Sequence, residues 1–532
     1  MAVYGESSQS AQTSRTPSNN ISSNQFLNPM LSEQGTNTSA RPGNYDDDSE
    51  DMAPIHKLPN EILTQIFERF HIHIGVKNPE FMHVCSRWRT VAITSPTVWT
   101  FVALDLATEG NCHARLLKTH LEYSKVLPLT VILELRDRSS EDCLDLVVSH
   151  AARWKSLQLI LHGPWSPQGS NLALRFATIR ELALLKVFSC ISAAENFHSP
   201  SDLLPSILGP ARNLQKLLLD DFSLFPDVEH SFQRTPITQL VLLVNRSNAT
   251  FKKLVECCRW LIELKYVISS WESRVPIQVL APQDSNTVQV LQVELQNEGR
   301  GVQEFFIQLL CACTFPALTS LSISPLEKSR HRAMFSGAWP AQEFNDLFSR
   351  SGCRLTTLAL NYISLSDINV ICLLLNTPAL TDLTIREVRP SAMVHRAAQQ
   401  AEIAYYSNYG GVVRNESEPQ VLFPVTKFFL RNLRIRHLIY DDDNNKSQSQ
   451  PLVPKLARLT LDVNGTDGEF DEEAFGNMVF SRCPPMQGST SAEQVSRGLR
   501  CLKFVKLRVF KRGSRTRVVE IDLEKEDGWK GL

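Results

Sequence analysis

A short apolar pattern that recurs along most of the chain constrains the fold more than any other feature of the sequence. The pattern is apolar-x-x-Leu-x-apolar, and most copies follow one another at intervals of about 21 to 37 residues. The copies are Trp154/Leu157/Leu159, Ile179/Leu182/Leu184, Leu214/Leu217/Leu219, Ile237/Leu240/Leu242, Leu261/Leu264/Tyr266, Val288/Leu291/Val293, Leu318/Leu321/Ile323, Leu355/Leu358/Leu360, Leu380/Leu383/Ile385, Ile435/Leu438/Tyr440, Leu456/Leu459/Leu461 and Leu499/Leu502/Phe504. Each copy alternates like a short strand and gives way to a segment with helical spacing. A unit this short cannot cover its own apolar face, so the pattern favours stacked units that share one core.

These copies resemble leucine-rich repeats, in which each unit supplies one strand and one helical return. The resemblance implies an α/β fold, with a solenoid of short parallel strands over residues 103–532. The consensus asparagine of such repeats occurs here only as Asn245 and Asn464, so the array is irregular. Short leucine-rich strands also occur in ordinary α/β proteins, and the pattern leaves that alternative open.

Alternation within each strand predicts which residues face a partner. The first, fourth and sixth residues of the pattern are expected to point into the core, and the third, fifth and seventh toward the concave surface. The candidate target-binding residues on that surface are Lys216, Asp220, Glu263, Lys265, Gln292, Glu294, Asp382, Arg386, Arg458 and Asp462. Their mixed charge suits recognition of a folded or polar partner, although an ordinary solvated face has the same composition.

Residues 54–102, which precede the repeats, have a helical pattern. Pro59 suits the first turn of a helix, and Glu61 follows where its charge meets the positive end of the helix dipole. Apolar residues recur at near-helical spacing over 58–70 and again over 81–92. Ser95-Pro96 marks a further helical start, with Trp99 in the turn after it. The segment is therefore predicted to be a small all-α module.

The module resembles the F-box, which docks on the Skp adaptor of cullin–RING ubiquitin ligases. The resemblance rests on Leu-Pro-x-Glu-Ile-Leu-x-x-Ile-Phe at 58–67, Cys-x-x-Trp-Arg at 85–89 and Ala92 with Pro96-x-x-Trp99. The polar connector at 71–75 departs from the F-box pattern. The residues implied to contact the adaptor are Leu58, Pro59, Ile62, Leu63, Ile66, Phe67, Val84, Cys85, Trp88 and Trp99. The alternative is a helical hairpin that belongs to the core of the following domain.

Polar segments divide the rest of the chain. Residues 1–53 are rich in Ser, Asn, Thr and Gln, and they are predicted to be a disordered tail. Loop insertions are predicted near 390–424 and 441–451. Near the C-terminus, basic residues alternate around Gly513-Ser514, which predicts a hairpin that closes the array.

Composition limits the partners and the compartment. The formal net charge of −1 gives no field that would attract nucleic acid or a membrane surface. The first residues lack a secretory signal pattern, and no run has the length of a membrane helix. The twelve cysteines are scattered, as reduced thiols of the cytosol or nucleus are. We therefore expect a cytoplasmic or nuclear protein with neither a nucleic-acid nor a membrane partner.

The sequence contains no arrangement typical of catalysis. His71-x-His73 and Cys311-x-Cys313 come nearest to metal-ligand pairs, and neither has a second pair at zinc-like spacing. A Gly-rich phosphate loop, a Gly-x-Ser-x-Gly elbow and a His-Glu-x-x-His helix are all missing. We expect no catalytic residue, no metal and no cofactor, and hence a protein that is not an enzyme.

Together the two resemblances imply a substrate receptor of a Skp–cullin–F-box ubiquitin ligase. Residues 54–102 would dock on a Skp-family adaptor and thereby join a cullin, while the repeats bind a protein target. The alternative is an interaction scaffold outside any ligase, in which residues 54–102 form an N-terminal cap.

Overall fold

The described part of the chain falls into two compact units. The computed structural model describes residues 54–74, 80–106, 111–136, 141–162, 172–192, 203–219, 232, 234–244, 257–268, 283–284, 287–295, 300–326, 339–363, 365–387, 424–435, 452–465, 470–482, 501–510 and 516–522. The predicted tail over 1–53 and the predicted insertions, apart from Pro424, lie outside these residues. The units are Met1–Leu58 and Pro59–Leu532. The first contributes the short helix η1 (Pro54–Lys57), and every other element belongs to the second.

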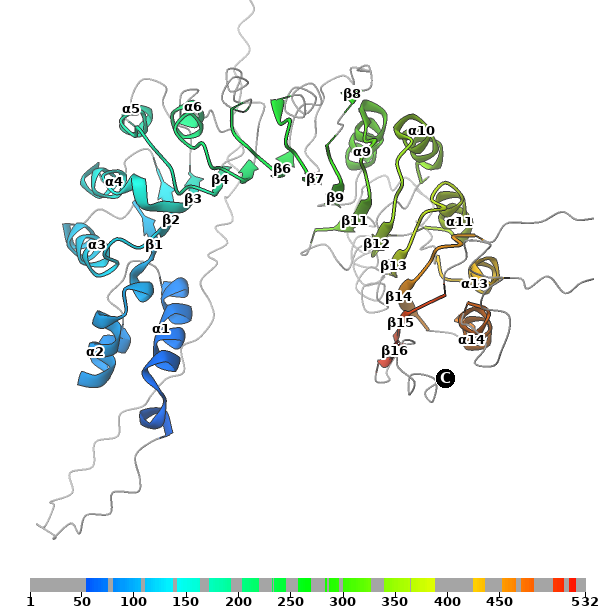
Figure 1. Ribbon diagram of the computed structural model, residues 1–532, viewed down its shortest axis with the longest axis horizontal. Coiled ribbons are helices and arrows are strands. Elements are labelled where there is room, and N and C mark those ends of the chain that lie inside the picture. The colour runs from blue at the N-terminus through cyan, green and yellow to red at the C-terminus, as the bar shows by residue number, and fades with distance from the viewer. Residues whose placement is uncertain are drawn as a thin grey trace, which may run out of the picture. The chain divides into compact units, whose positions relative to one another are not determined.

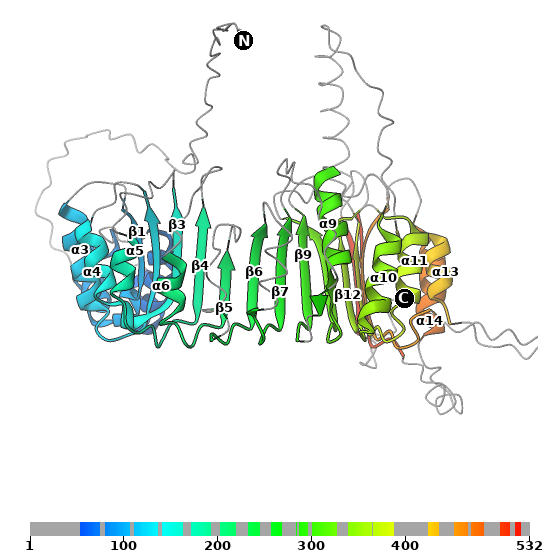
Figure 2. The same cartoon turned by 90° about the horizontal axis from the view of Figure 1, so that it is seen from above.

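A long, mostly parallel sheet forms the centre of the second unit (Figures 1 and 2). Its fourteen described strands lie side by side in chain order. They are β1 (Phe101–Asp105), β2 (Leu129–Leu135), β3 (Trp154–Leu161), β4 (Val187–Ser192), β5 (Lys216–Leu219), β6 (Gln239–Val244), β7 (Glu263–Ile268), β9 (Val290–Leu295), β11 (Ser320–Pro325), β12 (Thr357–Asn361), β13 (Asp382–Arg386), β14 (Arg458–Asn464), β15 (Phe504–Phe510) and β16 (Arg517–Asp522). The last pair, β15 and β16, is antiparallel, which confirms the predicted closing hairpin. The short strands β8 (Gln283–Asp284) and β10 (Cys313–Thr314) pair separately.

The described helices cover one face of this sheet, and none of them lies on the other face, which we call the open face (Figure 1). Those on the covered face are α3 (Asn111–Tyr123), α4 (Glu141–Val148), α5 (Leu172–Ala177), α6 (Leu203–Leu208), α9 (Arg300–Ala312), α10 (Ala341–Ser351), α11 (Asp367–Leu375), α13 (Lys427–Leu433) and α14 (Glu472–Ser481), with the short η4 (Ala151–Arg153) before β3. The N-terminal module consists of α1 (Asn60–Ile74), η2 (Glu80–His83), α2 (Ser86–Thr94) and η3 (Pro96–Trp99). The structure therefore confirms the predicted α/β class with short parallel strands and helical returns.

Burial alternates along each strand. In β2, for example, Leu129, Val131 and Leu133 are fully buried against the helices, while the residues between them are half-buried on the open face. Residues at the same position of successive strands join one apolar core that runs from Val102 to Val509. Each unit completes its core only through its neighbours, as the length of the pattern requires.

One backbone contact repeats along the start of the strands. The carbonyl oxygen of the residue just before a strand accepts two hydrogen bonds. The donors are the N–H groups of two successive residues at the start of the next strand. The carbonyl of Lys186, for instance, lies 2.9 Å from the nitrogens of both Gln215 and Lys216. The same pair of hydrogen bonds to one carbonyl repeats from strand to strand as far as β15. It satisfies backbone groups that would otherwise be unpaired where the strands begin.

Arginine side chains also join successive units. Arg482, at the end of α14, donates to the carbonyl oxygens of Leu433 (2.6 Å), Leu452 (2.7 Å) and Val453 (3.1 Å). Arg350 in α10 donates in the same way to the carbonyl of Leu310 in α9 (2.7 Å). Leu310 and Leu433 lie in the last turn of their helices, where carbonyls have no partner within the helix, so a guanidinium from the next unit satisfies them.

A buried carboxylate fixes the point where the segment 388–423 leaves and rejoins the described chain. Glu387 is 3% exposed. Its Oε1 accepts a hydrogen bond from the N–H of Val425 (3.0 Å), and its Oε2 accepts one from the N–H of Asn464 (2.7 Å). Its own N–H donates to the carbonyl of Asp462 (2.8 Å). The residues on either side of the segment are therefore held close together beside the end of β14.

Three of the predicted strand positions are wrong. The copy placed at Ile179/Leu182/Leu184 belongs to a turn, and the strand beside it, β4, buries Phe188 and Cys190. The final copy is shifted by one register, because Val505 and Leu507 are buried while Phe504 lies half-buried on the open face. Apolar residues in the turns before these strands match the pattern as well as the strand residues do. A short pattern therefore does not fix the register.

The copy at Ile435 is wrong for another reason. The sheet passes directly from β13 to β14, and Ile435 follows α13 at the end of the described segment; Leu438 and Tyr440 lie outside it. The pattern also missed β1 and β2, which extend the sheet at its N-terminal end.

Candidate interaction surfaces

The helical module has its own aromatic core. Helix α1 begins directly after Pro59 and carries an inner stripe, Leu63 and Phe67, which is buried. The ring of Phe67 stacks on that of Phe81 at 4.5 Å between centroids, and it lies 5.2 Å from the ring of Trp88. These contacts fix α1 against η2 and α2.

Trp99 connects the module to the sheet domain. Its Nε1 donates to the carbonyl of Ala92 (2.7 Å). Its ring centroid lies 4.8 Å from that of His120 and 4.9 Å from that of Tyr123, both in α3. The module therefore packs on the first units of the sheet, in the same compact unit.

A second, outer stripe of α1 is apolar and exposed. Ile62, Ile66 and Phe70 recur every four residues and are 41%, 42% and 42% exposed. Val84, before α2, is 57% exposed. Large apolar side chains on one helical stripe of a small module are typical of a surface that meets a partner.

The predicted adaptor contacts separate into surface and core residues. Those on the surface are Pro59, Ile62, Ile66 and Val84, with Cys85 and Trp88 half-buried; Leu58 is half-buried within the first unit. Leu63, Phe67 and Trp99 are at most 1% exposed and fill the core, so we correct the prediction that they touch an adaptor. Both stripes of α1 consist of large apolar side chains, so the sequence pattern does not distinguish which one faces inward. Phe70, on the outer stripe, was missed.

The open face of the sheet carries the predicted target-binding residues. Lys216 is exposed on β5, and Asp220 lies outside the described residues. The others gather in two clusters, which we call the central cluster (Glu263, Lys265, Gln292 and Glu294) and the C-terminal cluster (Asp382, Arg386, Arg458 and Asp462). The register places each cluster on adjacent strands, so the prediction of a shared face is correct for these residues.

Side chains of the central cluster bind one another across β7 and β9. The Nζ of Lys265 lies 2.8 Å from Oε1 of Glu294, and Nε2 of Gln292 donates to Oε1 of Glu263 at 3.2 Å. All four are half-buried. Because these groups already have partners, a ligand would have to exchange existing contacts at this cluster.

The C-terminal cluster is organised around a buried carboxylate. Asp462 is 2% exposed, with its Oδ2 lying 3.7 Å from Nε of Arg386 and 3.3 Å from Nη1 of Arg508. Arg458 approaches Asp382 at 3.6 Å. Asp462 therefore orients two guanidinium groups, and we correct its predicted role as a contact residue. Arg508 was missed because β15 was placed in the wrong register.

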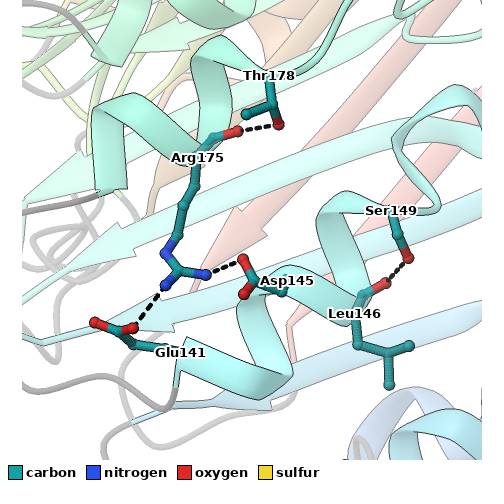
Figure 3. A network of polar contacts seen from close by, with 6 residues as sticks. All are labelled: Glu141, Asp145, Leu146, Ser149, Arg175 and Thr178. Carbon is teal, nitrogen blue, oxygen red and sulfur yellow. Dashed lines mark hydrogen bonds and ion pairs between the residues drawn. The ribbon is translucent and has the colours of Figure 1, made fainter.

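The helix side carries polar contacts between neighbouring units (Figure 3). Arg175 in α5 pairs with Glu141 (2.6 Å) and with Asp145, which lie one turn apart in α4. Such pairs fix one helix against the next and leave the guanidinium no free charge for a partner. Nothing in the sequence pattern indicated this pairing, because it joins residues about thirty positions apart.

No metal or membrane site is evident in the residues that the structure describes. Among them, no three His, Cys, Asp or Glu side chains are grouped to hold a metal ion. Cys311 is exposed while Cys313 is buried, and the side chains of His71 and His73 are not described. None of the described helices combines the length and apolar character that crossing a bilayer requires.

Two buried thiols should make stability fall at alkaline pH. Burial raises the pKa of Cys258, beside Cys257, and of Cys313 from 9.0 to about 12. Between these values the unfolded chain loses protons that the folded chain keeps, so unfolding becomes easier as pH rises. We expect each thiol to lower the free energy of unfolding by about 1 kcal/mol between about pH 8 and pH 10.

Urea unfolding of the wild type and of a Cys258→Ala/Cys313→Ala variant at both pH values checks this difference. The variant should lose less stability on going to the higher pH. A Cys372→Ser variant, altered at a half-buried cysteine of α11, is the control and should behave as the wild type does. Equal pH dependence in the wild type and the double variant would contradict the prediction.

No family model and no curated sequence matches this chain.

Proposed function

We propose that the chain is a substrate receptor of a Skp–cullin–F-box ubiquitin ligase in the cytoplasm or nucleus. The observation that carries the proposal is the outer stripe of α1. Ile62, Ile66 and Phe70 are more than 40% exposed, while Leu63 and Phe67 of the same helix are buried in the module's core. Burying a large apolar side chain contributes roughly 1.5–3 kcal/mol, so an exposed stripe of three favours a docking partner.

The order of motifs supports the nature of that partner. The F-box-like blocks at 58–67 and 85–89 contribute to α1 and α2, and the exposed Ile62 and Ile66 belong to the first block. In this proposal the stripe docks on a Skp-family adaptor, and a cullin follows through the adaptor. The leucine-rich-repeat-like sheet presents its open face to a protein target. The receptor performs no chemistry itself and acts by raising the target's effective concentration near the charged conjugating enzyme.

Adaptor binding tests the proposal directly. Replacing Ile62 and Ile66 with Asp places charge on the outer stripe and leaves the inner stripe intact. We expect the affinity for a purified Skp adaptor to fall at least about tenfold, or about 1.4 kcal/mol. Isothermal titration of the full chain measures it, and circular dichroism checks the fold.

A matched control changes apolar residues that are just as exposed on another helix. Ile368 and Leu375 in α11 are 60% and 66% exposed, and their replacement by Asp should leave adaptor binding unchanged. Wild-type protein that fails to bind any Skp adaptor would contradict the ligase proposal.

A second candidate function is a scaffold in which the module serves only as an N-terminal cap. It is favoured by Trp99, whose ring packs on His120 and Tyr123 and so covers the first units of the sheet. Capping uses the inner residues and docking uses the outer stripe, so the two roles are compatible. The cap alone becomes the better account if the outer stripe proves inert in the adaptor titration.

A further inference from the structure

Basic side chains gather where strands β3 to β7 begin. This edge of the sheet, the lower edge in Figure 2, consists of the helix-to-strand turns. We call the following exposed residues the basic edge: Lys155, Arg180, Lys186, Arg212, Arg234 and Arg259. In the described parts of these turns, Glu181 is the one exposed acidic residue. The charge is local, since the whole chain has a formal net charge of −1.

The strand ladder brings these cations close together. The N–H of Lys186 donates to the carbonyl of Lys155 (2.9 Å), so the two residues are neighbours across adjacent strands. Arg212 and Arg259 hold equivalent positions, two residues before the buried Leu214 and Leu261, in the turns that precede β5 and β7, strands two apart in the sheet. At about 4.8 Å per strand, that separation is about 10 Å. None of these cations makes an ion pair with a residue that the structure describes, in contrast to Arg175.

Beyond a first row of open-face residues that is mostly polar (Ser156, Lys216 and Gln239), the open face of β3 to β6 carries apolar side chains. The side chains are half-buried, and we call them the apolar zone: Ile160, Val187, Ile191, Leu218, Val241 and Leu243. Register pairs Ile160 with Ile191 on β3 and β4, and Leu218 with Val241 on β5 and β6; Ser189 of β4 is the register partner of Leu218. In the row of Leu218 and Val241, β11 and β12 hold Ser322 and Ala359 instead.

We propose that the basic edge and the apolar zone together bind an acidic segment of a partner protein that also carries apolar side chains. Unpaired cations on neighbouring turns repel one another, and an anionic partner relieves that repulsion. The apolar zone gives such a segment a surface on which to bury aliphatic groups. That the partner is the ligase's target rests on the proposed function, whereas the binding itself does not.

The same observations favour a protein segment over nucleic acid. Phosphate backbones would use the basic edge but leave the apolar zone uncovered. Single-stranded nucleic acids also need a series of aromatic stacking platforms. In the described turns of this edge the exposed aromatic side chain is Trp260, beside Arg259.

Fluorescence anisotropy with the full chain tests the proposal. The probe is a fluorescein-labelled peptide, Glu-Asp-Glu-Asp-Gly-Leu-Ser-Leu-Val. Comparison probes replace its apolar residues with Ser, replace its acidic residues with Lys, or substitute a single-stranded oligothymidylate of equal charge. We expect the first peptide to bind at least about tenfold more tightly than each comparison probe, with affinity falling as salt rises.

Variants locate the site. Arg212→Glu/Arg259→Glu should weaken binding at least about tenfold, and Leu218→Ser/Leu243→Ser should weaken it without changing its salt dependence. Arg354→Glu is the matched control, because Arg354 is an exposed arginine in the turn before β12, and it should bind as the wild type does. Circular dichroism of each variant checks the fold.

The following outcomes overturn the proposal: no binding of the first peptide, equal binding of the acid-only peptide or the oligothymidylate, or no loss in Arg212→Glu/Arg259→Glu. Neutralising the chain's own acidic run, Asp46, Asp47, Asp48, Glu50 and Asp51, to Asn and Gln tests for self-occupation. At least about tenfold tighter binding by that variant would make the chain itself the occupant and overturn a partner-binding site.

Peptide binding at the basic edge and adaptor docking can be tested independently. The Ile62→Asp/Ile66→Asp variant should bind the peptide as the wild type does. A chain that captures the adaptor but not the peptide contradicts only this inference. A chain that binds the peptide but not the adaptor contradicts only the proposed ligase function.

Discussion

Replacing Arg482 with Ala should lower the free energy of unfolding by about 3–6 kcal/mol. Arg482 is 1% exposed, and its guanidinium donates hydrogen bonds to the backbone carbonyls of Leu433, Leu452 and Val453. Burial lowers its pKa from 12.5 to about 10, so it stays charged at neutral pH. Alanine would leave three acceptors without a partner in a closed site, at about 1–3 kcal/mol each. Urea unfolding followed by circular dichroism measures the loss.

Two variants separate this effect from the simple removal of a long side chain. Arg482→Lys keeps a positive charge but cannot reach three carbonyls at once, so its loss should be intermediate. Arg350→Ala removes an exposed arginine that donates to Leu310 in the same manner, and water can replace it there, so the loss should be about 1 kcal/mol. If Arg482→Ala and Arg350→Ala cost the same, burial of the acceptors is not the cause.

Replacing Phe67 with Ala should destabilise the helical module by about 3–5 kcal/mol. Phe67 is 1% exposed and lies between Phe81 and Trp88, so its removal leaves a cavity among aromatic rings. Hydrogen exchange followed by mass spectrometry should show protection lost first in α1, η2 and α2, with the strands from β3 onward little affected. That gradient is expected where each unit contacts only its neighbours.

The adjacent residue supplies the control. Ile66 is 42% exposed on the outer stripe, and Ile66→Ala should change stability by less than about 1 kcal/mol. Equal destabilisation by Phe67→Ala and Ile66→Ala would mean that the two stripes of α1 are both internal. The surface proposed for adaptor docking would then not exist.

The sequence predicted what depends on local periodicity. Alternation within strands identified the buried leucines of most units, such as Leu217, Leu240 and Leu264, because a strand has only two faces. It failed at β4, where Leu182 in the turn satisfies the pattern and Phe188 takes the position of the consensus leucine in the strand. Register there is decided by packing against neighbouring units, which a single window of sequence does not contain.

The inward face of α1 and the ion pairs between strands were predicted less well, because both also depend on packing between units. A helix with two adjacent apolar stripes gives no local signal for which one faces inward, and this misplaced Leu63 and Phe67. Asp462 followed the alternation onto the open face but is buried there by Arg386 and Arg508 from the two neighbouring strands. Long side chains on adjacent strands can cover a short one, and only the assembled sheet reveals it.

Glu387 has a consequence for how this chain can vary in length. Because its carboxylate holds Val425 and Asn464 where β13 and β14 end, the gap between residues 387 and 425 is closed by contacts that do not involve the intervening segment. Once the ends of a loop are fixed, each doubling of a flexible loop costs only about 0.6 kcal/mol. Substitutions, deletions or whole inserted domains at this position should therefore be tolerated by the rest of the sheet. Evolution and protein engineering alike could add a new module here without rebuilding the units on either side.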